Sequence, residues 1–211
     1  MPDWTLECLT VGPLQMNAWL LLDHASSDAA LIDPGDEVPR LLKRIDDAGC
    51  QLKWLLATHG HFDHVAGAAE VQASVDLPLR LHHADEFLVE NMPQHQALYG
   101  LPTSAVPRMQ PDLADGDTIA LGDCKLQVVT VPGHSPGQVM FVWDNHAIVG
   151  DCLFAGSVGR TDLPGGSFSI LEASIRERIY TLPGDTVIHP GHGPDTTVDR
   201  ERRTNPFVSD A

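Results

Sequence analysis

The chain has 211 residues, 43% of them hydrophobic, which is enough apolar material for one sizeable domain spanning residues 1–211. Its formal charge of −16, from 29 acidic against 13 basic residues, argues against nucleic acid or an anionic membrane surface as the main partner. No signal-peptide pattern opens the sequence, and no apolar run reaches the roughly 18 residues of a membrane span. We therefore expect a cytoplasmic protein; the oligomeric state is not encoded in any pattern we recognise.

Apolar or alternating runs predict ten β-strands, and helical spacing of apolar residues predicts four helices between them. The last helix has the pattern of a capping box, Ser169-x-x-Glu172, and a stop at Pro183-Gly184. This mixture indicates sheets covered by helices, of the α/β or α+β class. The predicted strands are 5–11, 18–22, 29–32, 52–57, 79–81, 118–121, 126–131, 139–143, 147–149 and 186–188, and the predicted helices are 38–48, 64–74, 84–91 and 169–182.

Four of the predicted strands end in a short turn that carries a histidine or an aspartate. Glycine and proline in these turns let the backbone leave the sheet sharply, and loops at sheet ends commonly hold functional groups on a rigid scaffold. If the four strand ends are neighbours in space, their polar side chains converge. The residues concerned are His59, His134, Asp151 and His192.

The segment 58–64 concentrates the side chains that bind metals, with three histidines and one aspartate in six positions. Imidazole nitrogens and carboxylate oxygens suit zinc, iron or manganese, whereas a core gains nothing from four groups that must each be desolvated. His59 and His61 can face one point from an extended turn, and Asp63 and His64, at the start of the next helix, can face a second. One segment can therefore serve two metal ions.

Together with these ligands, several flanking motifs resemble those of the metallo-β-lactamase-fold hydrolases, and within them the glyoxalase II-like group. The resemblance covers nearly the whole chain and implies a four-layer αβ/βα sandwich with the metal site at one edge. After His192 only 19 residues remain, enough for about one short helix, so the chain is more similar to compact bacterial hydroxyacylglutathione hydrolase-like proteins without a C-terminal helical domain. The motifs are 31–35, 58–64, 132–137, 150–154, 156–162 and 191–194.

The resemblance assigns a role to each candidate ligand. It implies two divalent metal ions, zinc as first choice with iron or manganese as alternatives: His59, His61 and His134 on the first ion, Asp63, His64 and His192 on the second, and Asp151 as the bridge. Two such ions with Asp63, Asp151 and a bridging hydroxide leave a net charge of about +1, suited to activating water and stabilising an oxyanion. The expected reaction is attack of that hydroxide on a small-molecule thioester, such as S-D-lactoylglutathione or a related hydroxyacyl thioester.

The alternative function is oxidation of glutathione persulfide. Persulfide dioxygenases share this fold and a loop like Gly159-Arg160-Thr161-Asp162, but use one Fe(II) held by two histidines and one aspartate. Their last motif tends to read Ala-His-Asp, whereas 191–194 here is Gly-His-Gly-Pro, similar to the dinuclear hydrolases. A β-lactamase, an RNA-processing enzyme and a fold relative without catalysis are less favoured.

Four further residues have open roles. Asp33 is either a carboxylate that orients a metal-binding histidine or a turn residue of Asp-Pro-Gly. Arg160 is expected to pair with Asp162 in preference to binding a substrate carboxylate. His95 lies in the proline-rich segment 91–111, predicted to be a loop over the site, and the Cys152 thiol adjoins Asp151 but is expected to be a buried small hydrophobe.

Overall fold

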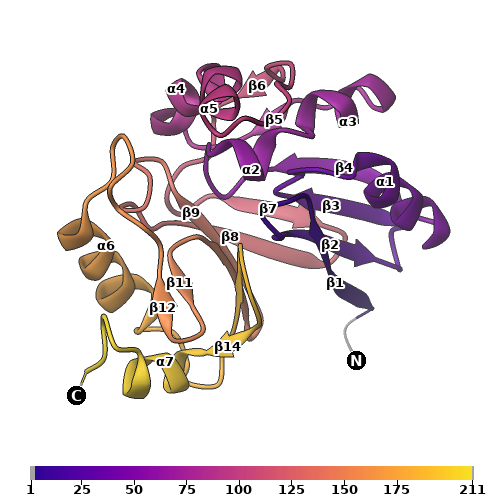
Figure 1. Cartoon of the computed structure of the whole chain (residues 1–211). Helices are drawn as coiled ribbons and strands as arrows, with labels where there is room; N and C mark the ends of the chain where they lie inside the picture. The colour runs from indigo at the N-terminus through magenta and orange to yellow at the C-terminus, as the bar shows by residue number, and fades with distance from the viewer. Residues whose placement is uncertain (1–2, 211) are drawn as a thin grey trace.

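Two six-stranded sheets form the centre of the computed structural model, which describes residues 3–210 (Figure 1). The first sheet has the order β1-β2-β3-β4-β5-β6 and consists of β1(Trp4–Val11), β2(Met16–Asp23), β3(Asp28–Ile32), β4(Gln51–Leu56), β5(Leu79–Arg80) and β6(Met109–Gln110). The second has the order β14-β13-β10-β9-β8-β7 and consists of β7(Thr118–Leu121), β8(Cys124–Thr130), β9(Val139–Trp143), β10(His146–Gly150), β13(Val187–Pro190) and β14(Thr196–Thr197). A small hairpin pairs β11(Leu153–Phe154) with β12(Ser157–Val158).

Helices cover the outer faces of both sheets (Figure 1). None of the helices formed by residues 3–210 has both the length and the hydropathy needed to cross a bilayer. They are α1(Val38–Asp47), α2(Phe62–Val65), α3(Ala68–Ser74), α4(Glu86–Glu90), α5(Met92–Leu98), α6(Phe168–Ser174) and α7(Val198–Thr204), with a 3₁₀ turn η1(His83–Asp85) and a π-helical turn η2(Ile175–Ile179).

Three apolar clusters separate four layers. Strand β2 is buried along its whole length because it is covered on both faces: Leu20 and Leu22 join the cluster under α1 and α3, whereas Trp19 and Leu21 join the cluster between the sheets. This follows from the period of two in a strand. A third cluster packs the second sheet against α6, η2 and α7. The predicted four-layer αβ/βα sandwich of mixed α/β class is confirmed.

All ten predicted strands are present, with ends within two residues of the prediction. Strands β6, β11, β12 and β14 were missed because each has two residues and shows no period of its own. The short helix expected after His192 is α7.

The predicted helix 64–74 is wrong as one element, because Gly67 divides it into α2 and α3. The Gly67 amide donates to the Pro34 carbonyl at 2.8 Å, and a Cβ at Gly67 would lie 2.6 Å from that same oxygen. The loop after β3 therefore packs directly against the helical backbone here, and the contact requires a residue without a side chain.

Two other predictions need correction, one of a helix start and one of a loop. The capping box is wrong: the helix begins at Phe168 after Ser167, whose side chain makes no cap, and it continues as the π-helical turn η2. The segment 91–111 contains α5, with Pro93 in its first turn, where a missing N–H costs nothing. The prolines of the segment predict a loop, but Pro93 stands at the start of a helix.

The strands that precede the candidate ligands deliver them to a common edge. In the first sheet, β3 runs parallel to β4, so Asp33 and Thr58 follow neighbouring strand ends. In the second, β10 runs parallel to β13, so Asp151 and His192 do the same. A bridge between Met16 and His192 joins the two sheets at this edge.

Gly133 lies in the loop before His134, where the backbone packs tightly against α6. Its φ is +133°, and an added Cβ would lie 2.3 Å from the Leu171 backbone nitrogen. We expect Gly133→Ala to lower the free energy of unfolding by about 2–4 kcal/mol, because backbone strain and overpacking add. The control is Gly116→Ala, which has φ +87° but open space around the new methyl group, and which should cost only about 1–2 kcal/mol. Equal losses in denaturant unfolding would contradict the packing argument.

Candidate metal centre

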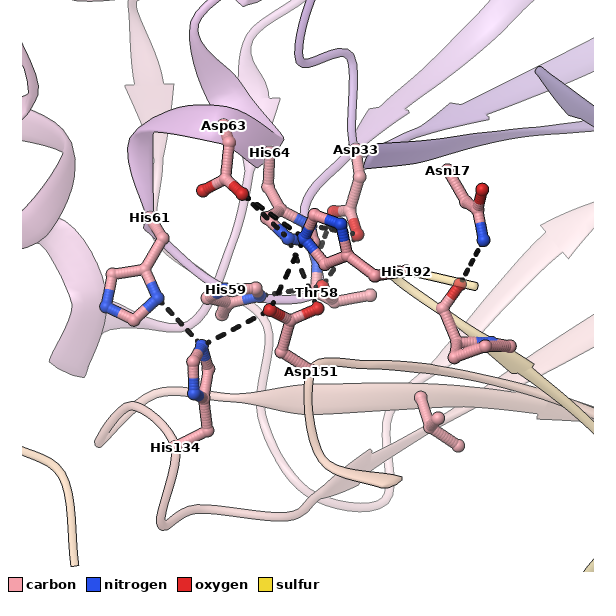
Figure 2. Close-up of polar contacts among 12 residues, drawn as sticks. Asn17, Asp33, Thr58, His59, His61, Asp63, His64, His134, Asp151 and His192 are labelled. Atoms are coloured by element: carbon pink, nitrogen blue, oxygen red, sulfur yellow. Dashed lines mark hydrogen bonds and ion pairs between the residues drawn. The ribbon is translucent and has the colours of Figure 1, made fainter. Parts of the chain in front are cut away.

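Seven side chains predicted as ligands meet at the shared edge of the sheets (Figure 2). They form three overlapping groups, and within each group the possible ligand atoms lie within 4.8 Å of one another. The second group joins the other two, since it shares His59 with the first and His64 with the third. The groups are His59, His61 and His134; His59, His64 and Asp151; and Asp63, His64 and His192.

The cluster leaves buried polar atoms without hydrogen-bond partners. These atoms include Nε2 of His59, His61 and His64, together with Oδ1 of Asp151. An unpaired buried nitrogen or oxygen is costly, so such a concentration in one place needs another partner. Imidazole and carboxylate donors in groups of three fit divalent transition metals such as zinc, iron or manganese.

The distances between these side chains are short across both halves of the cluster. His61 Nδ1 lies 2.8 Å from His134 Nε2. On the other side, His64 Nε2 is 3.3 Å from Asp151 Oδ1, and His192 Nε2 is 3.3 Å from Asp63 Oδ2 and 3.6 Å from Asp151 Oδ2. Donor atoms from segments more than 100 residues apart in sequence therefore face a common interior.

The electrostatic environment differs between the two halves. Burial, reinforced by neighbouring imidazoles, lowers the pKa of His59 well below its ordinary value and lowers that of His61 to about 3. Burial also disfavours charge on His64, but the carboxylates of Asp151, Asp33 and Asp63 outweigh it and raise the pKa of that imidazole. Burial thus keeps His59 and His61 neutral, whereas the negative charge of the cluster lies around His64.

Asp33 orients two of the histidines. Its carboxylate accepts a hydrogen bond from His64 Nδ1 at 2.9 Å, and it accepts from both the amide and the hydroxyl of Thr58 at 2.7 Å. Because the Thr58 proton goes to Asp33, its oxygen accepts from His59 Nδ1 at 3.1 Å. The Nε2 atoms of both rings are then free to bind a metal. Asp33 also sits in a turn, but there its backbone carbonyl accepts from the Gly35 amide, and its carboxylate contacts Thr58 and His64 and not the turn.

The loop carrying Arg160 orients a third histidine through its backbone. His134 Nδ1 donates to the Arg160 carbonyl at 2.7 Å, which leaves His134 Nε2 directed at the cluster. The Arg160 side chain instead makes two hydrogen bonds with Asp162, at 2.7 and 2.8 Å, the ion pair expected from the sequence.

Asp85 is a buried carboxylate that the sequence reasoning missed. It accepts from the Gly60 amide at 2.9 Å, between two candidate ligands, and from the Ser135 hydroxyl at 2.7 Å and the Gly137 amide at 2.6 Å, just after His134. It therefore ties together the two loops of the first ligand group. Burial raises its pKa despite these three donors. In the sequence, Asp85 looks like an ordinary helix-start residue, so no local pattern reveals it.

Asn17 is a second missed residue, and it holds the loop of His192. Its amide group donates to the Pro190 carbonyl at 3.1 Å and to the Gly193 carbonyl at 2.9 Å, while its backbone N–H donates to Gly191 at 2.7 Å (Figure 2). An asparagine within the buried strand β2 was the signal available in the sequence, because buried amides need partners.

Two residues of open role lie on different sides of the centre. Cys152 is fully buried in the cluster under α6, and burial raises the pKa of its thiol, as for an unreactive core cysteine. His95, from α5, lines a cavity of about 430 Å³ beside the metal centre, so the segment 91–111 does border the site, with the helix α5 in its first part and a loop after it.

Known proteins similar to this chain span its whole length. A hydroxyacylglutathione hydrolase, GloC of Haemophilus influenzae, is 36% identical over 210 residues, covering 97% of this chain and 98% of that protein. The human mitochondrial persulfide dioxygenase ETHE1 is 35% identical over 198 residues, covering 90% of this chain and 70% of that protein.

Solved structures agree with these relatives. TTHA1623 in a di-iron-bound form is 42% identical with a TM-score of 0.86, covering 96% of this chain and all of that one. The BLEG-1 B3 metallo-beta-lactamase is 33% identical with a TM-score of 0.87, covering 97% of this chain and 99% of that one.

The Asp85 contacts predict that this residue supports metal binding. In Asp85→Asn, an amide N–H₂ must face one of three N–H or O–H donors, which we expect to cost about 1–3 kcal/mol of stability and to weaken metal binding by the first ligand group. Calorimetric Co²⁺ titration and denaturant unfolding measure the two effects. The control, Asp112→Asn, removes an exposed carboxylate paired with Arg80 and should change neither measurement appreciably. Unchanged Co²⁺ affinity in Asp85→Asn would contradict the proposed support.

The family model of the metallo-beta-lactamase superfamily matches residues 11–192, which is most of the chain and includes all seven clustered side chains. Fold, cluster and relatives therefore agree, and the chain belongs to the metallo-beta-lactamase superfamily, whose enzymes include metal-dependent hydrolases.

Proposed function

We propose that this protein is a dinuclear metallohydrolase that cleaves a thioester, with hydroxyacyl thioesters such as S-D-lactoylglutathione as the reference substrates. The single observation that carries the proposal is the third ligand group, because Asp63, His64 and His192 add a complete second set to the three histidines of the first. Similarity to the hydroxyacylglutathione hydrolase GloC supports the choice of reaction.

In this proposal each metal has three ligands of its own and shares a carboxylate. His59, His61 and His134 would hold one ion, Asp63, His64 and His192 the other, and Asp151 would contribute to both. Zinc is the first candidate, with iron or manganese as alternatives, because His and Asp donors suit all three. Similarity to a di-iron-bound protein keeps iron in view.

The chain's own contribution to catalysis is orientation. Metal ions in such a site supply a water of lowered pKa and polarise a carbonyl. Asp33 orients His64 directly and His59 through Thr58, and the Arg160 carbonyl orients His134. The second nitrogen of each imidazole then faces the reaction site. During hydrolysis the thioester C–S bond breaks, the acyl carbon gains the oxygen of water, and the products are a carboxylic acid and a thiol. A thiolate leaves without prior protonation, so the reaction does not require a general acid.

A second candidate, persulfide dioxygenation, is favoured by the 35% identity to human ETHE1 and by the Gly-Arg-Thr-Asp loop at 159–162. That activity would use a single Fe(II). It leaves unexplained why His192 is held by Asn17 against Asp63, in contact with the rest of the cluster.

Metal content and activity together distinguish the two functions. We expect about two metal ions per chain and hydrolysis of S-lactoylglutathione, followed as loss of thioester absorbance, with no oxygen uptake on glutathione persulfide. Chelation should abolish hydrolysis, and added Zn²⁺ or Mn²⁺ should restore it. One iron per chain, with oxygen consumption and no thioester cleavage, would establish the dioxygenase instead.

Replacement of His192 gives an independent test of the second ion. In His192→Ala we expect the metal content to fall toward one ion per chain and kcat to fall by at least about 100-fold, because the remaining members of the second group are too few to hold an ion. Its matched control is His95→Ala, a histidine of the same cavity outside all three ligand groups, which should keep both ions. Unchanged metal content in His192→Ala would favour a mononuclear site.

A further inference from the structure

The metal centre opens into a cavity of the size of a small molecule. The cavity measures about 430 Å³, and five of the clustered side chains form its floor, so a molecule inside it is in reach of the metal ions. The floor residues are His61, Asp63, His134, Asp151 and His192.

Apolar side chains from four separate segments form the outer wall of this cavity. Phe62 and Tyr99 pack with their ring centroids 5.3 Å apart, at the junction of α2 with the end of α5. Leu98 is 83% exposed, and Tyr99 and Leu14 are also exposed, although a folded protein gains by covering such groups. Exposed apolar groups around a concave site are typical of ligand recognition. The wall consists of Leu14, Phe62, Leu98, Tyr99, Leu163 and Pro164.

Lysine and arginine are nearly absent from the lining of the cavity. Among the described residues that line the cavity, Arg160 is the single lysine or arginine, and Asp162 already occupies its guanidinium with two hydrogen bonds. A second cavity of about 230 Å³ adjoins the first through Leu14, Phe62 and Asp63, and its other charged lining residues are Asp36 and Glu70. Among the described residues that line the two cavities, none is a lysine or arginine without an acidic partner.

Glutathione carries two carboxylates, on its glycyl and glutamyl ends, and binding them out of water requires cationic or multiple hydrogen-bonding partners. A protein of formal charge −16 adds a repulsive background to that cost. An uncharged thiol group of aromatic or aliphatic character instead gains by covering Leu98, Tyr99 and their neighbours.

We propose that the thiol portion of the natural substrate is uncharged and apolar, and that it fills the cavity walled by Leu98, Tyr99 and Leu163 in place of a glutathionyl group. This inference rests on the thioester hydrolysis proposed above. It specifies the leaving group and makes no demand on the acyl group beyond a carbonyl that reaches the metal centre.

Two thioesters with the same acyl group test the inference in the metal-loaded enzyme. One is S-lactoylglutathione and the other is the lactoyl thioester of benzyl mercaptan, so that only the thiol differs. We expect kcat/KM to be at least about tenfold higher for the benzyl thioester, the range available to an apolar group in a pocket. Equal or better hydrolysis of the glutathione thioester would overturn the inference and leave the proposed function standing. Failure of both thioesters would overturn the proposed function itself.

A charge placed on the cavity wall gives a second test. Leu98→Lys should lower the ratio of kcat/KM for the benzyl thioester over the glutathione thioester by at least about fivefold, since the new ammonium attracts carboxylates and interrupts the apolar surface. The matched control is Phe207→Lys, another exposed apolar residue that lines neither cavity. Both substitutions are at exposed positions, and unfolding curves check that the variants fold. An unchanged ratio in Leu98→Lys would overturn the assignment of this wall to the thiol.

Discussion

The structure depends on one constraint: imidazoles and carboxylates are buried together at the edge shared by two sheets, and they cannot all satisfy one another. Nε2 of His59, His61 and His64 and Oδ1 of Asp151 find no hydrogen-bond partner among the side chains around them. Burying such atoms is unfavourable in a metal-free chain and favourable when each is a ligand. The same constraint fits the electrostatics of the cluster, where burial keeps His61 neutral and three carboxylates gather around His64.

A layer of hydrogen bonds behind the cluster makes this arrangement specific. Asp33 fixes His59 and His64, the Arg160 carbonyl fixes His134, Asp85 joins the loops of the first group, and Asn17 holds the loop of His192. Each of these groups comes from a segment distant in sequence from the one it holds. The apolar clusters on both sides of each sheet bring these segments together. The geometry of the centre therefore depends on the packing of the four layers.

The family relationship does not determine the substrate, which depends on the surface above the metal ligands. Similarity extends both to a hydroxyacylglutathione hydrolase and to a persulfide dioxygenase, at nearly the same identity, so overall similarity does not discriminate between the two activities. The wall of the cavity is built here of the turn at Leu14, the start of α2, the end of α5 and the loop after Arg160. The wall is apolar, and Arg160 beside it is already paired with Asp162. These two features restrict the substrate in a way that the metal ligands alone do not.

The sequence by itself determined the strands and the cluster of His and Asp in 58–64, because these follow from short-range patterns such as the period of two in a strand. Its resemblance to the metallo-β-lactamase-fold hydrolases implied the four-layer fold and the set of seven clustered side chains. The sequence did not determine that Gly67 divides a helix, that α5 borders the site, or that Asp85 and Asn17 hold the ligand loops. Those features depend on contacts between segments far apart in the chain, such as Gly67 with Pro34 or Asn17 with Pro190. Only the tertiary structure decides them, because a residue's local pattern carries no information about which distant backbone groups will need its hydrogen bonds or its lack of a side chain.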